Sequence, residues 1–146
     1  MKPFFAICEE GVSEQDKNFL HNVFMRERPY AKLVVWKEAH MLCKAIYAAT
    51  MTFPTSERYC LAQQMRRSSY SVPMNIAEGN TRRTKKDHRR FIDIALGSLE
   101  ELHYQCLLAL ELRYIDTGQA NRLDSHMQRV GYLLNKLRTA LLEARA

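Results

Sequence analysis

Residues 84–113 read TKKDHRRFIDIALGSLEELHYQCLLALELR, and their apolar side chains recur at the spacing of one long helix. One seam steps by threes and fours through Ile92, Ala95, Leu99, Leu102, Cys106 and Ala109. Thr84 and Asp87 begin the stretch in a capping-box pattern, with Asp in place of the usual Glu. Further apolar residues surround this seam, so the helix is expected to be central or to contact another subunit.

Three more segments show the same periodicity, so helices are predicted at about residues 33–51, 56–78, 85–113 and 118–143. Short links join them, and short links favour antiparallel neighbours. Glycine and proline are scarce, which disfavours a β-sandwich or barrel. We therefore predict an all-α protein, with an up-down-up-down four-helix bundle over residues 32–146 and an N-terminal extension over residues 1–31.

The second predicted helix carries three residues that affect its ends and its course. Thr55 or Ser56 is the expected N-cap. Pro73 lacks a backbone donor, so a kink is expected there. Gly79 is placed to cap the C-terminus.

Two glycines fall inside the long helices, where glycine costs about 1 kcal/mol relative to alanine. Close approach of two helices would be a reason to keep them. We therefore expect Gly97 and Gly131 to face each other.

The N-terminal extension lies outside the periodic region. Ser13 and Asp16 could cap one short amphipathic helix, or the segment could be a loosely docked extension. The apolar residues that follow this pattern are Phe19, Leu20, Val23 and Phe24. Met25 could even be the true start, because the periodic part begins only at Leu33.

The positive charge is concentrated in one short run. The chain has 146 residues, which indicates one domain, and its formal net charge is +6. Residues 82–90 hold six cations and one anion, so a net charge of +5 lies in nine residues. The predicted nucleic-acid-binding residues are Arg82, Arg83, Lys85, Lys86, Arg89 and Arg90, with Arg66 and Arg67 as the next pair along the chain.

Cations at the start of a helix oppose its dipole, so this run is better explained by a polyanionic partner than by helix stability. Guanidinium groups suit phosphate, and no aromatic residue interrupts the run, so phosphate contacts with little sequence readout are expected. A plain solvated surface and a protein partner stay open. Arg66 and Arg67 could line the same face or pair with Glu78 and Glu100.

No motif for catalysis or metal binding is complete. Glu100 and His103 have the spacing of a di-iron ligand pair, but the chain has no second Glu-x-x-His. We predict no metal, no cofactor and no enzymatic activity. No apolar run approaches the about 20 residues that span a bilayer, no signal peptide is expected, and the cysteines form no C-x-x-C, so the chain is expected to be cytoplasmic.

Several strings resemble a known bacterial family. They are Leu33-Val34-Val35-Trp36, Phe53-Pro54, Arg58-Tyr59, Gln64-Met65-Arg66-Arg67, Ser71-Val72-Pro73-Met74-Asn75-Ile76-Ala77-Glu78-Gly79, Arg82-Arg83, Phe91 and Ile94-Ala95-Leu96-Gly97-Ser98-Leu99-Glu100-Glu101. The chain resembles the four-helix-bundle proteins encoded in 23S ribosomal RNA intervening sequences. That family is related to the accessory variability determinant (Avd) of diversity-generating retroelements. The resemblance covers roughly residues 33–142.

The resemblance implies a small bundle that assembles as a homopentameric ring. In the retroelement relatives, the pentamer is a basic barrel that binds nucleic acid and the reverse transcriptase. The family has no established catalytic activity. Repeated around a five-fold ring, a +5 patch would give about +25, which strengthens weak single contacts.

These expectations together describe a non-catalytic, oligomeric protein that binds nucleic acid, with RNA favoured over DNA. One alternative is a protein-interaction adaptor, such as a reverse-transcriptase accessory protein of a retroelement. A remote alternative is a metal-dependent bundle enzyme. Genomic position would distinguish them: inside a ribosomal RNA gene, beside a retroelement, or free-standing.

Overall fold

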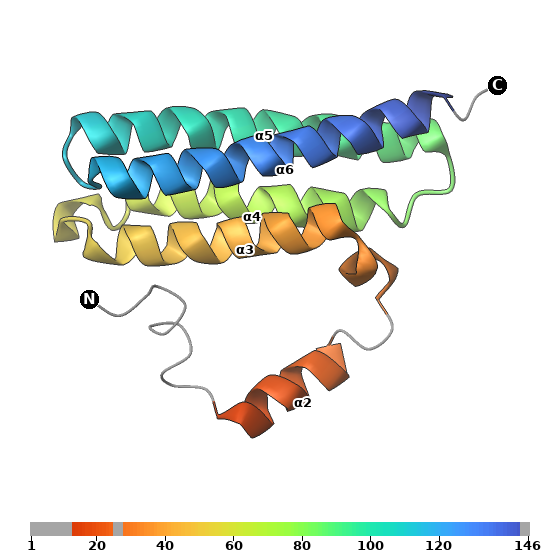
Figure 1. The fold of residues 1–146 in the computed structure, drawn as a ribbon, viewed down its shortest axis with the longest axis horizontal. Coiled ribbons are helices and arrows are strands. Elements are labelled where there is room, and N and C mark those ends of the chain that lie inside the picture. Colours follow the sequence, from red (N-terminus) through yellow and green to blue (C-terminus); the bar gives the residue numbers. More distant parts are fainter. Residues whose placement is uncertain (1–12, 25–27, 144–146) are drawn as a thin grey trace.

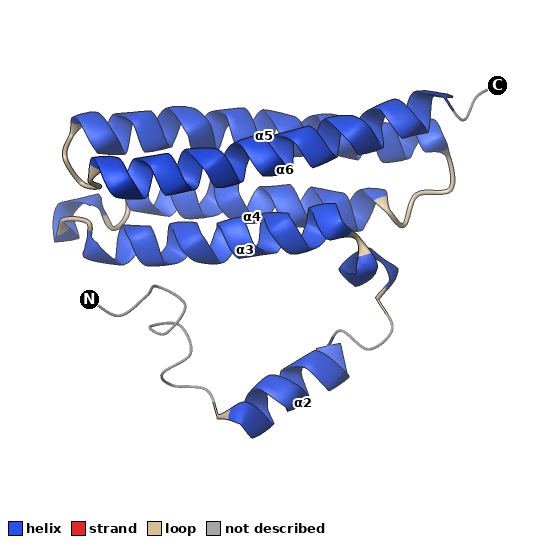
Figure 2. Cartoon of the chain, in the orientation of Figure 1, coloured by secondary structure: helices blue, strands red, loops and turns tan. Residues whose placement is uncertain are grey.

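The described residues, 13–24 and 28–143 of a computed structural model, form helices and no strands (Figure 2). The four long helices are α3 (Val34–Ala49), α4 (Leu61–Gly79), α5 (Lys85–Glu111) and α6 (Thr117–Glu143). Consecutive helices run in opposite directions along one another (Figure 1). Helices α3 and α5 each pack against both α4 and α6, so the four close into a bundle. The all-α prediction is confirmed for this part of the chain.

The predicted seams form the core of the bundle. Among the side chains with no exposed surface are Leu42, Ile46, Met65, Ile76, Ile92, Leu102 and Leu134. Burying each large aliphatic side chain stabilises the fold by about 1.5–3 kcal/mol relative to leaving it in water. The helix ends predicted for α3, α5 and α6 agree with the structure within two residues.

Helix α4 begins later than predicted, at Leu61 rather than near residue 56. Pro54 is extended, and two 3-10 helices, η2 (Thr50–Thr52) and η3 (Thr55–Glu57), occupy the link from α3. Cys60 then has a non-helical backbone (φ −113°, ψ −111°) and is the N-cap, without a capping side-chain hydrogen bond. The prediction of Thr55 or Ser56 as the N-cap is therefore wrong, because η3 ends before α4 starts.

A free backbone N–H at the start of α4 instead finds its hydrogen-bond acceptor in a carboxylate from η3. The backbone N–H of Leu61 donates to Glu57 Oε2 at 3.2 Å. The hydroxyl of Tyr114, in the link between α5 and α6, donates to the other carboxylate oxygen at 3.2 Å. One acidic side chain thus joins the α3–α4 link to the α5–α6 link at the same end of the bundle.

At the C-terminal end of α4, Gly79 has a different role from the cap that the sequence predicted. The helix continues through Pro73, and the kink predicted there stays a prediction. Gly79 is the last residue of α4 and has no positive φ, so it is not a left-handed cap. A Cβ at Gly79 would lie 2.8 Å from the Phe91 Cβ and 3.0 Å from His88 Cδ2. Glycine is required there because α5 approaches the backbone of α4 closely.

The expectation that Gly97 and Gly131 face each other is wrong. A Cβ at Gly97 would have nothing within 4 Å, whereas one at Gly131 would lie 3.3 Å from Leu99 Cδ2. Next to Gly97, the Ser98 hydroxyl makes a 2.8 Å hydrogen bond with that of Ser71. The polar contact between α4 and α5 is therefore made by serines, and Gly97 lies on the exposed side of α5.

The described part of the N-terminal extension contains helix α2 (Glu14–Phe24), and the 3-10 helix η1 (Pro29–Lys32) leads into α3. Ser13 Oγ accepts a hydrogen bond from the Asp16 N–H at 3.1 Å, which is the predicted cap. Met25, the possible alternative start, lies outside the described residues. None of the helices in the described ranges combines the length and apolar character that a membrane crossing requires.

Candidate nucleic-acid interface

The basic run lies in the α4–α5 turn and the first turns of α5. We call its six cations the basic end: Arg82, Arg83, Lys85, Lys86, Arg89 and Arg90. Helix α5 starts on the predicted capping box. The Asp87 N–H donates to Thr84 Oγ1 at 3.1 Å, and the Thr84 hydroxyl donates to Asp87 Oδ2 at 2.5 Å. The cap stabilises the first turn of α5, so the backbone positions of the cations along this turn are fixed relative to one another.

Arg82 is held against the bundle. Its guanidinium pairs with the carboxylate of Glu78, one turn earlier. Its Cζ also lies 4.5 Å from the centroid of the Phe91 ring, a cation–π contact. Glu78 is therefore engaged by Arg82, and not by Arg66 or Arg67 as one reading of the sequence had it.

Three cations of the basic end point their charge to solvent without a carboxylate partner. Arg83, Lys86 and Arg90 are exposed, and no ion pair involves them among the described residues. Arg89 is half-buried and is likewise outside these ion pairs. Such charges remain available to an external anion, which makes these side chains the sharpest targets for mutation.

Further cations reach the same end of the bundle from distant parts of the sequence. Figure 1 shows that the start of α5 lies beside the last turns of α6, and that η1 lies at this end too. Arg138 of α6 donates to Asp93 Oδ1 at 2.7 Å, Arg28 is the N-cap of η1, and Lys32 is its last residue. Sequence reasoning missed these three cations. The antiparallel topology was the signal that could have found Arg138, because it returns the end of α6 to the start of α5.

Arg66 and Arg67 do not join the basic end. Gly79, where α4 ends, lies thirteen residues beyond Arg66, or about 20 Å along the helix. Arg66 Nε donates to Thr50 Oγ1 at 2.8 Å, and its Cζ lies 5.2 Å from the centroid of the Tyr47 ring. Arg67 is exposed on α4. A role for this pair in nucleic-acid binding stays a prediction, at a separate position on the bundle.

One histidine lies within the basic run and is positioned to stay neutral. Burial lowers the pKa of His88 below its ordinary value. Its Nε2 is buried without a hydrogen-bond partner in the described structure. His88 packs beside Gly79, so it belongs to the contact between α4 and α5 and adds no charge to the basic end near neutral pH.

The two residues that suggested a metal site, Glu100 and His103, lie in different surroundings. His103 Nε2 lies 3.5 Å from Asp124 Oδ1 of α6, and Glu100 is exposed. Within residues 13–24 and 28–143, no group of three or more His, Cys, Asp or Glu side chains could hold a metal ion. His103 therefore serves a contact between α5 and α6, whereas Glu100 faces solvent.

The comparisons with known proteins agree with this architecture. One solved structure is a protein of unknown function from the S23 ribosomal protein family of Bacteroides thetaiotaomicron. It has a TM-score of 0.68 and 20% sequence identity, over 73% of this chain and 96% of that chain. A search of curated proteins gave no match. The family model described as 23S rRNA-intervening sequence protein matches residues 31–136, so the chain belongs to that family.

Proposed function

We propose that this protein binds the phosphate backbone of nucleic acid in the cytoplasm, with RNA favoured over DNA, through the basic end. The observation that carries the proposal is a net charge of +5 in nine consecutive residues at one end of the bundle. Arg28 and Lys32 add to the positive potential at this end, whereas Arg138 is neutralised by its ion pair with Asp93. A field of this kind attracts polyanions at distances up to about a Debye length, about 10 Å at 0.1 M salt.

The side chains favour phosphate over bases. Arginine donates in a planar fork that matches two phosphate oxygens, and lysine acts as a point charge. The aromatic ring of this region, Phe91, is covered by the Arg82 guanidinium and is not open for base stacking. Binding through such contacts depends strongly on salt and weakly on sequence.

The proposal includes self-assembly into a homopentameric ring, which would repeat the basic end around an axis. Support comes from the outward side of α5, where Ile94, Tyr104 and Leu107 are exposed and Gly97 leaves room for close approach. Light scattering on the full chain should give about five times the mass of one chain. A monomeric mass at micromolar concentration would contradict the assembly while leaving phosphate binding open.

The test of phosphate binding replaces Arg83, Lys86 and Arg90 with glutamine. Each lost phosphate contact lowers the slope of log K against log salt by about 0.9 for duplexes and about 0.7 for single strands. Three lost contacts therefore reduce the slope by about 2 to 3, and the affinity at 0.1 M salt by roughly two orders of magnitude. Fluorescence anisotropy with labelled RNA and DNA, from 50 mM to 300 mM salt, measures both quantities.

A matched control replaces Arg58, Arg113 and Arg122 with glutamine. These three exposed arginines lie in the α3–α4 and α5–α6 links and the first turns of α6, at the opposite end of the bundle. The control removes the same net charge and should retain most of the affinity and slope. Equal losses in the two variants would mean that net charge, and not the basic end, controls binding. No loss in either would refute the proposal.

A further inference from the structure

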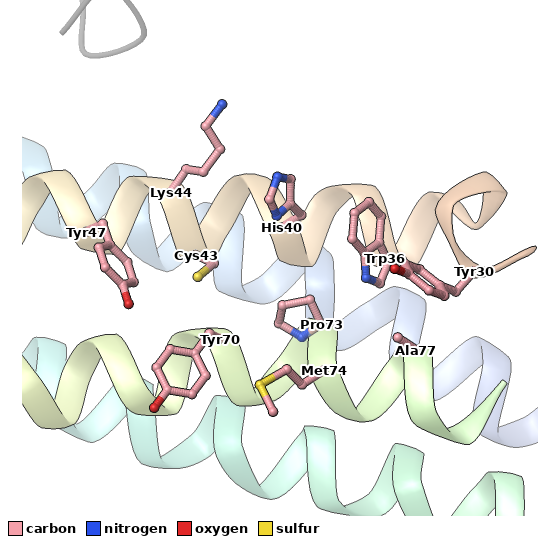
Figure 3. A pocket seen from close by; sticks show the side chains of 10 residues that line it. All are labelled: Tyr30, Trp36, His40, Cys43, Lys44, Tyr47, Tyr70, Pro73, Met74 and Ala77. Carbon is pink, nitrogen blue, oxygen red and sulfur yellow. The ribbon is translucent and has the colours of Figure 1, made fainter. Parts of the chain in front are cut away.

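An open apolar groove runs along the outer side of α3 and α4 (Figure 3). It has a volume of about 560 Å³, and its lining includes Trp36, Tyr47, Tyr70, Pro73 and Met74. Met74 is 59% exposed, and both tyrosines are also open to solvent. Large apolar side chains raise the free energy of the protein while they face water, so a segment that covered the groove would be stabilised there.

Aromatic contacts give the groove a rigid wall. The ring of Trp36 stacks on His40 with centroids 5.0 Å apart and planes 8° apart. On its other side, Tyr30 of η1 lies 5.1 Å from the same ring. Because these contacts are made within the bundle itself, a segment that enters the groove does not have to order this wall first.

Helix α2 is an amphipathic segment that exposes apolar side chains. Phe19 and Val23, four residues apart and so on one side of the helix, are 61% and 58% exposed. Helix α2 contacts no other element among the described residues. A helix of 11 residues is marginal in water by itself, because its few hydrogen bonds do not offset the entropy of ordering the chain.

We propose that α2 docks lengthwise into this groove of its own chain. The lengths agree. Helix α2 has 11 residues and is about 16 Å long, and the groove wall from Trp36 to Tyr47 covers 11 residue steps of α3, which is also about 16 Å. The directions agree too, since the chain reverses at η1 and α2 runs opposite to α3 (Figure 1). Docking places Phe19 and Val23 against the groove.

The charges of the two surfaces match in this antiparallel arrangement. Glu14 and Asp16 lie in the first turn of α2. Antiparallel docking brings this turn to the groove end that contains Lys44 and Tyr47, where Arg66 lies over the Tyr47 ring. The acidic start of α2 therefore meets cations of α3 and α4.

The same chain is the favoured source of the docked helix. A short tether gives α2 an effective concentration in the millimolar range at the groove, above that of any second copy in dilute solution. Docking of an amphipathic helix face into an apolar groove is a recurring mode of recognition. The inference does not depend on nucleic-acid binding, because neither Phe19, Val23 nor the groove belongs to the basic end.

The experiment uses Trp36, the single tryptophan of the chain, as the reporter. Acrylamide quenching of Trp36 emission is measured in the full chain, in Phe19→Asp/Val23→Asp, and in the control Asn18→Asp/Asn22→Asp. The control adds the same two charges about 100° around α2 from Phe19 and Val23. We expect the quenching constant to rise about twofold to threefold in the first variant and to stay unchanged in the control.

A second measurement identifies whose α2 is bound. In a chain with Gln15→Cys, which lies on the same side of α2 as Phe19, and with Cys8, Cys60 and Cys106 replaced by alanine, a short bismaleimide should join position 15 to Cys43. A product that runs as one chain on a denaturing gel supports the proposal. A cross-linked dimer, or equal quenching in the wild type and the Phe19→Asp/Val23→Asp variant, overturns it. Equal increases in both aspartate variants overturn it as well, because the apolar side would then be irrelevant.

Discussion

Alanine at Gly79 and alanine at Gly97 should change stability in opposite directions. Both glycines are helical, and glycine is less favourable than alanine in a helix by up to about 1 kcal/mol. At Gly97 a new Cβ would have nothing within 4 Å, so this gain is the whole expected effect. Gly97→Ala should therefore stabilise the bundle by about 0.5–1 kcal/mol.

The same methyl group at Gly79 has no room. It would lie 2.8 Å from the Phe91 Cβ, and relief requires a shift of α5, because a Cβ is fixed to the backbone. Overpacking of this kind costs about 1–3 kcal/mol. After the gain in helix propensity is subtracted, Gly79→Ala should destabilise the protein by about 1–2 kcal/mol.

The stabilities of Gly79→Ala and Gly97→Ala are measured by thermal and urea unfolding, followed by circular dichroism. For a chain of this size, 1 kcal/mol shifts Tm by about 4 °C, so the two variants should differ by about 10 °C. The urea midpoint should move in the same directions without a change in slope. A Gly79→Ala protein as stable as the wild type would refute the close approach of α4 and α5, and a destabilised Gly97→Ala would refute the open space beside Gly97.

Two further predictions concern titration and a hydrogen bond. Burial lowers the pKa of His40 and His88, with Lys44 contributing at His40, so the unfolded chain binds more protons and stability should fall as pH drops below about 6.5. The Tm should decline from pH 7.5 to pH 5.5, and His40→Gln/His88→Gln should flatten that decline; an equally steep decline would contradict the assignment. The Ser71–Ser98 hydrogen bond of 2.8 Å predicts that each serine-to-alanine change costs about 1 kcal/mol and that the double variant costs little more than one. Additive losses in urea unfolding would contradict that coupling.

The sequence by itself was sufficient for the fold class and for the core. The seams of α5 and α6 follow from spacings of three and four residues, which depend only on the pitch of a helix. The Thr84–Asp87 cap was also readable, since both partners lie within one turn. The concentration of charge in residues 82–90 needed only counting.

The late start of α4 was not predictable from the same rules. Thr55 and Ser56 have the right chemistry for an N-cap, but Pro54 and η3 redirect the chain first. Glu57 then satisfies Leu61 while it contacts Tyr114, a residue 57 positions away. The capping preference of Thr55 and Ser56 therefore did not decide where α4 begins. The contact of Glu57 with Tyr114 forms only when the α3–α4 and α5–α6 links meet in the folded bundle.

The availability of each basic side chain was decided by the tertiary structure. Arg82 is held by Glu78 and Phe91, Arg66 is held by Thr50 far from the basic end, and Arg138 reaches Asp93 from the end of α6. A spacing rule describes neighbours on one helix, whereas these partners are set by which helix faces which. The sequence therefore determined where the charge is, and only the packing of the four helices decided which charges are free to bind.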